Sequence, residues 1–121
     1  MPARPPGTRA LGEAGETLVA RHYEASGFEV LDRNWRSPAG ELDLVLRRGR
    51  LVVFCEVKTR AGIGFGVPAE AVDARKQARI RRLASAWLAE HRRRGETRFD
   101  VASVVWPKGG QPTVEVIEAA F

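Results

Sequence analysis

Two short apolar segments separated by four residues constrain the fold of this chain more than any other feature. They are ELDLVL at residues 41–46 and LVVFCEVK at residues 51–58. The RRGR sequence between them, at residues 47–50, is typical of a β-hairpin turn. The sequence therefore predicts two neighbouring antiparallel strands.

The register of this hairpin decides which side chains share a face. A turn centred on residues 48 and 49 places Asp43 opposite Phe54 and, further from the turn, Glu41 opposite Glu56. Opposite residues in an antiparallel pair point to the same face, and each strand alternates with a period of two. One face, here called the apolar face, is expected to consist of Leu42, Leu44, Leu46, Leu51, Val53, Cys55 and Val57. The other, the charged face, is apolar near the turn and ends in Glu41, Asp43, Glu56 and Lys58.

The charged face predicts a metal site. Like charges opposite each other destabilise a sheet, and partial burial raises the free energy of keeping them ionised. Lys58 offsets part of this repulsion, and a divalent cation would remove it. Asp43 and Glu56, separated diagonally by roughly 7–8 Å, are expected to share one ion, with Glu41 as a further candidate ligand. Hard oxygen ligands favour Mg²⁺ or Mn²⁺.

Such a site has the parts needed for phosphodiester hydrolysis. A divalent ion can polarise a phosphoryl oxygen and activate water. Lys58, two residues from Glu56 on the same face, can orient that water or stabilise charge on the phosphate. The alternative interpretation is a structural cluster of ion pairs, because such networks gather charges in the same way.

The rest of the sequence predicts one α/β domain with a mixed central sheet flanked by helices. We expect residues 1–10 to be a flexible leader and residues 11–121 a single domain. The further expected elements are a helix at 11–26, a strand at 28–35, a helix from Pro68 to about Gly95, and strands at 98–106 and 113–118. Because a helix joins the third strand to the fourth, these two strands are expected to be parallel through a right-handed crossover.

Positive charge is concentrated in the second expected helix. The net charge is +5, and residues 75–94 contain eight Lys or Arg residues but one acid, Glu90. This distribution suits a polyanion, either nucleic acid or an anionic membrane surface, although a solvated helix face is the alternative. The candidate phosphate-binding residues are Arg60, Arg75, Lys76 and Arg79.

The sequence also predicts a cytoplasmic protein. Its one cysteine, Cys55, has no intramolecular partner for a disulfide, which fits a reducing compartment. The apolar runs are far shorter than the roughly 20 residues that cross a bilayer. The first ten residues lack the apolar segment of a secretion signal.

These residues resemble a known nuclease superfamily. Glu41-Leu42-Asp43 followed by Glu56-Val57-Lys58 resembles the PD-(D/E)xK pattern, with Leu42 in place of the proline. The whole chain is similar to the YraN-type (UPF0102) family of small bacterial proteins, which are usually described as predicted endonucleases. The matching segments are Gly15-Glu16, Asn34-Trp35-Arg36, Gly40–Leu44, Phe54–Arg60, Phe65-Gly66, Lys76 and Phe99-Asp100-Val101.

The resemblance implies a restriction-endonuclease-like αβββαβ core. It implies that Asp43 and Glu56 are metal ligands, that Lys58 is the catalytic lysine and that Glu16 is the acid of the first helix. Asp100 is either a support residue for the site or a structural residue.

Three functions remain open from the sequence. The leading hypothesis is a Mg²⁺- or Mn²⁺-dependent nuclease acting on DNA. The second is a nucleic-acid-binding module that has kept the fold without catalysis, and the third is a membrane-surface or protein-interaction adaptor. A homodimer is also open, since small nucleases often pair to reach two strands.

Overall fold

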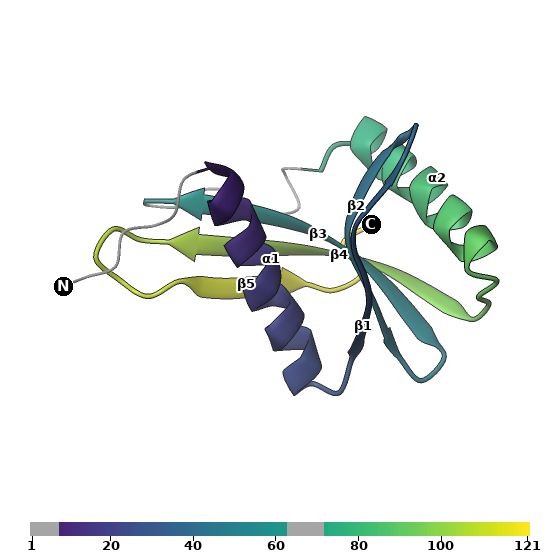
Figure 1. The fold of residues 1–121 in the computed structure, drawn as a ribbon, viewed down its shortest axis with the longest axis horizontal. Helices are drawn as coiled ribbons and strands as arrows, with labels where there is room; N and C mark the ends of the chain where they lie inside the picture. The colour runs from purple at the N-terminus through teal and green to yellow at the C-terminus, as the bar shows by residue number, and fades with distance from the viewer. Residues whose placement is uncertain (1–7, 63–71) are drawn as a thin grey trace.

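The part of the chain that the structure describes is a mixed α/β domain with one five-stranded sheet and two helices (Figure 1). A computed structural model describes residues 8–62 and 72–121. The elements are α1 Thr8–Ala25, β1 Glu29–Ser37, β2 Gly40–Arg48, β3 Leu51–Ala61, α2 Ala74–Glu90, β4 Glu96–Trp106 and β5 Thr113–Ile117. The strand order is β1-β2-β3-β4-β5, and only the β3–β4 pair is parallel among the described strands. The α/β prediction is confirmed, and the arrangement is compatible with a restriction-endonuclease-like core.

The two helices cover opposite faces of the sheet. Helix α1 buries Val19, Ala20 and Tyr23 in one core cluster, together with strand residues such as Leu44 and Cys55. Helix α2 buries an apolar side of its own in a second cluster, against strand residues of β2, β3 and β4; the helix residues are Ile80, Leu83, Ala84 and Trp87. Because the helices approach from opposite sides, a site on the sheet between them can receive side chains from both.

Helix α1 begins at Thr8, before the expected start at Leu11. It ends at Ala25, where Gly27 takes a φ of 87° and the Phe28 N–H donates to the Tyr23 carbonyl over 3.1 Å. A glycine in the left-handed region is a common helix stop, as the sequence predicted. None of the helices in the described segments is long and apolar enough to cross a membrane.

Helix α2 is shorter than the sequence predicted. The expected start at Pro68 lies outside the described residues, and within them α2 begins at Ala74, where the Asp73 carboxylate accepts a hydrogen bond from the Lys76 N–H over 2.9 Å. The expected end near Gly95 is wrong. The helix ends at Glu90, because Arg92 takes a φ of 52° and leaves the helical conformation.

The predicted hairpin register is wrong by two residues. Arg48 pairs with Leu51 across a two-residue turn in which Gly49 has a φ of 60°, so Val45, rather than Asp43, lies opposite Phe54. A two-residue turn of this kind needs a positive φ that glycine adopts without strain. A shift by two residues keeps each side chain on its face, since the side-chain period is two. The face assignments near the turn therefore hold although the partners change.

One member of the predicted apolar face is misplaced. Leu44 packs in the cluster under α1, whereas Leu42 packs in the cluster under α2. The alternation of β2 is therefore interrupted between them, at Asp43. The neighbouring β1 is irregular at the same level, because Asn34 has a φ of 52°. This irregularity shapes the candidate site.

Candidate active site

Asp43 lies where β2 separates from β3. Regular pairing between these strands runs from Arg48 opposite Leu51 to Leu44 opposite Cys55. At the next position the acceptor on β2 is a side-chain oxygen and not a backbone carbonyl. The Asp43 Oδ2 accepts a hydrogen bond from the Val57 N–H over 2.9 Å. The separation of the strands thus fixes the carboxylate between them.

Three acids from two elements meet at this separation. Glu16 on α1 and Glu41 and Asp43 on β2 each place a carboxylate oxygen within 4.8 Å of the others. These residues are here called the acidic cluster. Glu16, which the family resemblance implies is the acid of the first helix, has a side chain only 12% exposed. Oxygen donors from separate elements at this spacing fit a hard divalent cation such as Mg²⁺ or Mn²⁺.

Two polar side chains of β1 hold the acidic cluster in place. The Asn34 Nδ2 donates to the Glu16 carboxylate over 3.1 Å. The Arg36 Nε lies 3.2 Å from Glu41 Oε2. In the sequence, Asn34 and Arg36 stand out only as part of the family resemblance. Their spacing of two along a strand was the available signal that they point to one side.

Glu56 lies beside the acidic cluster but makes its closest ion pair elsewhere. Its Oε1 is 3.0 Å from the Nζ of Lys76, which comes from the first turn of α2. Lys76 was predicted to contact phosphate, and no sequence pattern indicates its pairing with Glu56, because that contact depends on how α2 crosses the sheet.

Burial and neighbouring acids raise the pKa of Asp43 to about 8. Burial is the largest cause, followed by the charge of Glu56, and the hydrogen bond from the Val57 N–H partly opposes both. Burial also raises the pKa of Glu16, against the lowering effects of Asn34 and Arg33. The acids therefore destabilise one another's charged forms, and a cation between them would relieve that repulsion.

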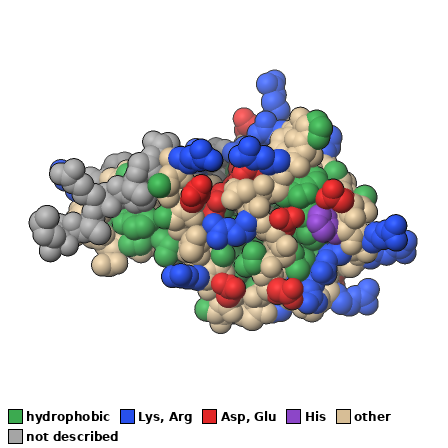
Figure 2. Space-filling model, in the orientation of Figure 1, with side chains coloured by type: hydrophobic (Ala, Val, Ile, Leu, Met, Phe, Trp, Pro, Cys, Tyr) green, Lys and Arg blue, Asp and Glu red, His purple; other side chains and the backbone are tan. Residues whose placement is uncertain are grey.

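Two hollows border the acids. One, of about 310 Å³, is lined by Gly40, Glu41, Asp43, Glu56, Lys76, Arg79 and Ile80. The other, of about 400 Å³, lies on the α1 side and is lined by Arg9, Gly12, Glu13, Glu16, Asn34, Arg36 and Glu41. Glu41 borders both. Acidic and basic side chains lie next to one another over the face shown in Figure 2.

Comparison with known proteins shows the family of this chain. A model of the family described as "Uncharacterised protein family UPF0102" matches residues 15–104. The chain belongs to the UPF0102 family. It is 57% identical over 113 residues to a UPF0102 protein of Frankia casuarinae, covering 93% of this chain and 96% of that one. It is 49% identical over 111 residues to a UPF0102 protein of Clavibacter michiganensis, covering 91% and 94% of the two chains. The predicted membership of this YraN-type family is confirmed.

Several predicted site residues of this UPF0102 chain lie at the edge of the site. Lys58 is exposed, two residues beyond Glu56 on β3, and forms no ion pair with another described residue. Arg60 and Arg75 are also exposed. Arg79 lines the hollow that contains Asp43 and Glu56. The structure thus brings together the acids, Lys76 and Arg79, and leaves the other cations on the surface nearby.

Asp100 has a structural place in this UPF0102 chain. Its side chain is fully buried and accepts hydrogen bonds from the Tyr23 hydroxyl over 2.6 Å and from the Ala119 N–H over 3.0 Å. Arg98 pairs with it at 2.8 Å, and this hydrogen bond raises the pKa of the Arg98 guanidinium. The residue joins α1, β4 and the C-terminal segment.

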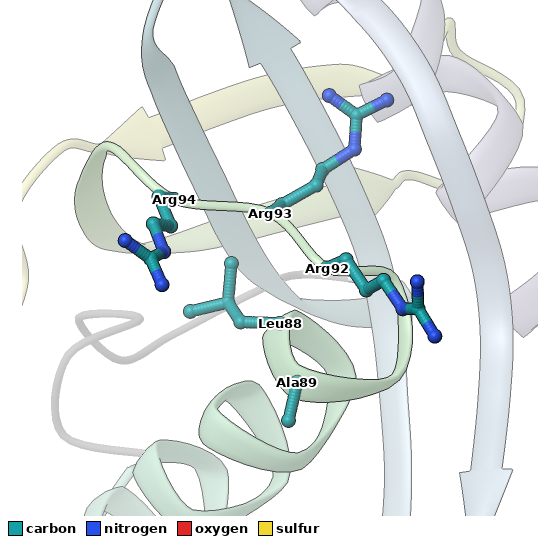
Figure 3. A pocket seen from close by; sticks show the side chains of 5 residues that line it. All are labelled: Leu88, Ala89, Arg92, Arg93 and Arg94. Atoms are coloured by element: carbon teal, nitrogen blue, oxygen red, sulfur yellow. The ribbon is translucent and has the colours of Figure 1, made fainter.

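A third hollow lies at the other end of α2 from the acids. It measures about 500 Å³ and is lined by Leu88, Ala89, Arg92, Arg93 and Arg94. The three guanidinium groups point in different directions (Figure 3), so they do not converge on one small ion. No carboxylate of the described chain lines this hollow. It therefore presents positive charge over a broad surface.

Proposed function

We propose that this protein is a Mg²⁺- or Mn²⁺-dependent nuclease that hydrolyses phosphodiester bonds in DNA. The observation that carries the proposal is the acidic cluster, whose three carboxylate oxygens lie within 4.8 Å of one another beside the basic helix α2. The cluster fits a hard divalent ion. When bound, such an ion supplies Lewis acidity toward a phosphoryl oxygen.

The side chains of this protein would bind the ion and stabilise the phosphate. Glu16, Glu41 and Asp43 would hold the ion, with Glu56 as a further ligand. Lys58, exposed beside the site, would stabilise negative charge on the phosphate during hydrolysis. Family resemblance to the PD-(D/E)xK nucleases supports the roles of Glu16, Asp43, Glu56 and Lys58.

The proposed substrate is DNA, bound through its phosphates. Arg79 and Lys76 line the hollow beside Asp43, and Arg60 and Arg75 are exposed nearby. Such cations bind phosphates without reading base sequence. The buried free thiol of Cys55, whose pKa burial raises, fits a protein that works in the reducing cytoplasm.

The test is cleavage of labelled duplex, single-stranded and branched DNA with Mn²⁺. We expect Asp43→Asn and Lys58→Met to reduce the cleavage rate by about 100-fold or more while DNA affinity in EDTA stays within about threefold. Glu115→Gln, which alters an exposed acid on β5, is the matched control and should cleave like the wild type. Equal cleavage by Asp43→Asn and by the control would contradict the proposal.

A second candidate function is DNA binding without catalysis. The Lys76–Glu56 ion pair favours it, because at 3.0 Å the lysine neutralises one expected metal ligand without any metal. Tight, salt-sensitive DNA binding with no cleavage in Mg²⁺, Mn²⁺ or Co²⁺ would support this second function and exclude the first.

A further inference from the structure

Lys76 occupies the position beside Glu56 at which a cation is needed. Its Nζ lies 3.0 Å from Glu56 Oε1, and the two side chains are 30% and 16% exposed. The position of Lys76 on the helix is fixed, because its N–H donates to the Asp73 carboxylate that caps α2. Next to it the Gln77 Nε2 donates to the Val72 carbonyl over 3.0 Å. The ammonium therefore reaches Glu56 from an ordered helix start.

Glu56 has another acid beside it as well as Lys76. Glu56 and Lys76 line the same hollow as Glu41, Asp43 and Arg79. Glu41 has a cation of its own, because Arg36 Nε lies 3.2 Å from its Oε2. Glu56 is also close enough to Asp43 for its charge to raise the pKa of that carboxyl. A divalent cation bound between Asp43 and Glu56 would therefore compete with Lys76 for the Glu56 oxygens.

We propose that Lys76 is a built-in counter-ion for Glu56 and that a divalent metal ion displaces it. This inference rests on the proposed metal site. Lys76 is a positioning residue in this scheme: it holds the Glu56 carboxylate in place while no metal is bound. The lysine is suited to exchange, because its charge sits on a flexible four-carbon chain, whereas the planar guanidinium of arginine would bind the carboxylate with two hydrogen bonds.

The displacement also prepares the site for phosphate. An ammonium paired with Glu56 is not available to an anion. Once released, the ammonium shares with Arg79 the lining of the hollow that contains Asp43. Metal and phosphate would then bind cooperatively, because each favours the arrangement in which Lys76 has left Glu56. Lys58, on the exposed part of β3, has no such partner among the described residues.

The experiment is titration of the metal-free protein with Mn²⁺, measured by calorimetry and by electron paramagnetic resonance of free Mn²⁺. If the lysine competes with the metal, Lys76→Met binds Mn²⁺ about three- to tenfold more tightly than the wild type. Lys76→Arg binds no more tightly than the wild type. Arg75→Met is the matched control, since it removes one exposed positive charge from the same helix turn, and its affinity should change by less than about twofold.

A double-mutant cycle separates competition for Glu56 from a general effect of charge. In a Glu56→Gln protein the ion pair is absent, so adding Lys76→Met should no longer tighten Mn²⁺ binding beyond the Arg75→Met change. Circular dichroism confirms that each variant is folded, and Lys76→Gln replaces Lys76→Met if the latter is not.

The outcomes distinguish this inference from the proposed function. If the wild type binds Mn²⁺ and Lys76→Met binds no more tightly than Arg75→Met, the counter-ion role is wrong and the metal site stands. If neither the wild type nor Lys76→Met binds Mn²⁺ at millimolar concentration, the metal site is wrong and both proposals fall with it.

Discussion

At the scale of the residue, Asp43 combines burial with the charge of a neighbouring acid. Burial and Glu56 raise its pKa from 3.8 to about 8, while the Val57 N–H stabilises the carboxylate over 2.9 Å. The sequence predicted that Asp43 and Glu56 belong to one charged cluster, because alternation along two strands is local. Glu16 was expected at the site only through the family resemblance, and the pairing of Lys76 with Glu56 was not predicted, because both contacts depend on how the helices pack.

The raised pKa of Asp43 predicts how stability depends on pH without metal. Between about pH 4 and pH 8 the folded protein holds a proton at Asp43 that the unfolded chain has lost. The contribution of this group is therefore fully present below pH 4 and is lost as the pH rises through 8. Asp43→Asn, which keeps an acceptor for the Val57 N–H, should lack this dependence.

Urea unfolding in EDTA at pH 5 and pH 8.5 measures this difference. On passing to the higher pH, we expect the wild type to lose on the order of 1–3 kcal/mol more than Asp43→Asn. Saturating Mn²⁺ should reduce the loss, because it stabilises the ionised carboxylates. Parallel pH profiles for the two proteins in EDTA would contradict the assignment of a raised pKa to Asp43.

At the scale of the element, β2 shows why some of the fold could be predicted and some could not. The alternation of side chains is local to the strand. The predicted faces of Val45 and Leu46 are therefore correct although the predicted register was wrong by two residues. The RRGR turn allows either two or four loop residues, so the register itself was not fixed by the sequence. The change of side between Leu42 and Leu44 depends on the separation of β2 from β3, which no local pattern indicates.

The packing of α1 on β3 depends on Gly15. A Cβ at this position would overlap the Thr59 side chain, whose Oγ1 is buried without a hydrogen-bond partner among the described residues. In an exposed helix, Gly→Ala would stabilise by about 1 kcal/mol. Here we expect Gly15→Ala to destabilise the protein by about 1–3 kcal/mol, because the overlap moves α1 away from the sheet.

Thr59→Ala provides the matched test of that contact. Alone it should change the free energy of unfolding by less than about 1 kcal/mol, since it removes an unpaired hydroxyl. Combined with Gly15→Ala it should restore about half of the lost stability, which urea unfolding of all four proteins measures. Additive effects of the two substitutions would show that Gly15 is needed for another reason. Because Glu16 follows Gly15, displacement of α1 should also weaken Mn²⁺ binding.

At the scale of the whole molecule, α2 links two basic regions. Lys76 and Arg79 line the hollow beside the acids at its first turns, and Arg93 and Arg94 line the hollow after its last turn. From Lys76 to the last helical residue, Glu90, is 14 residues, so the two regions are about 21 Å apart at 1.5 Å per residue. At about 3.4 Å per base pair, a duplex must extend over about six base pairs to reach both.

This spacing predicts that the contribution of the distant arginines depends on DNA length. In EDTA, Arg93→Ala/Arg94→Ala should weaken binding to a 20-base-pair duplex by about tenfold and reduce the slope of log affinity against log salt by about 1–2. For a hairpin with a five-base-pair stem, which is too short to reach from the acids to these arginines, the same substitutions should change affinity by less than about twofold. Arg21→Ala/Lys108→Ala removes the same charge from exposed positions on α1 and beyond β4 and controls for net charge. An equal loss of affinity for both DNA lengths, or for both variants, would mean that net charge rather than the position of Arg93 and Arg94 governs binding.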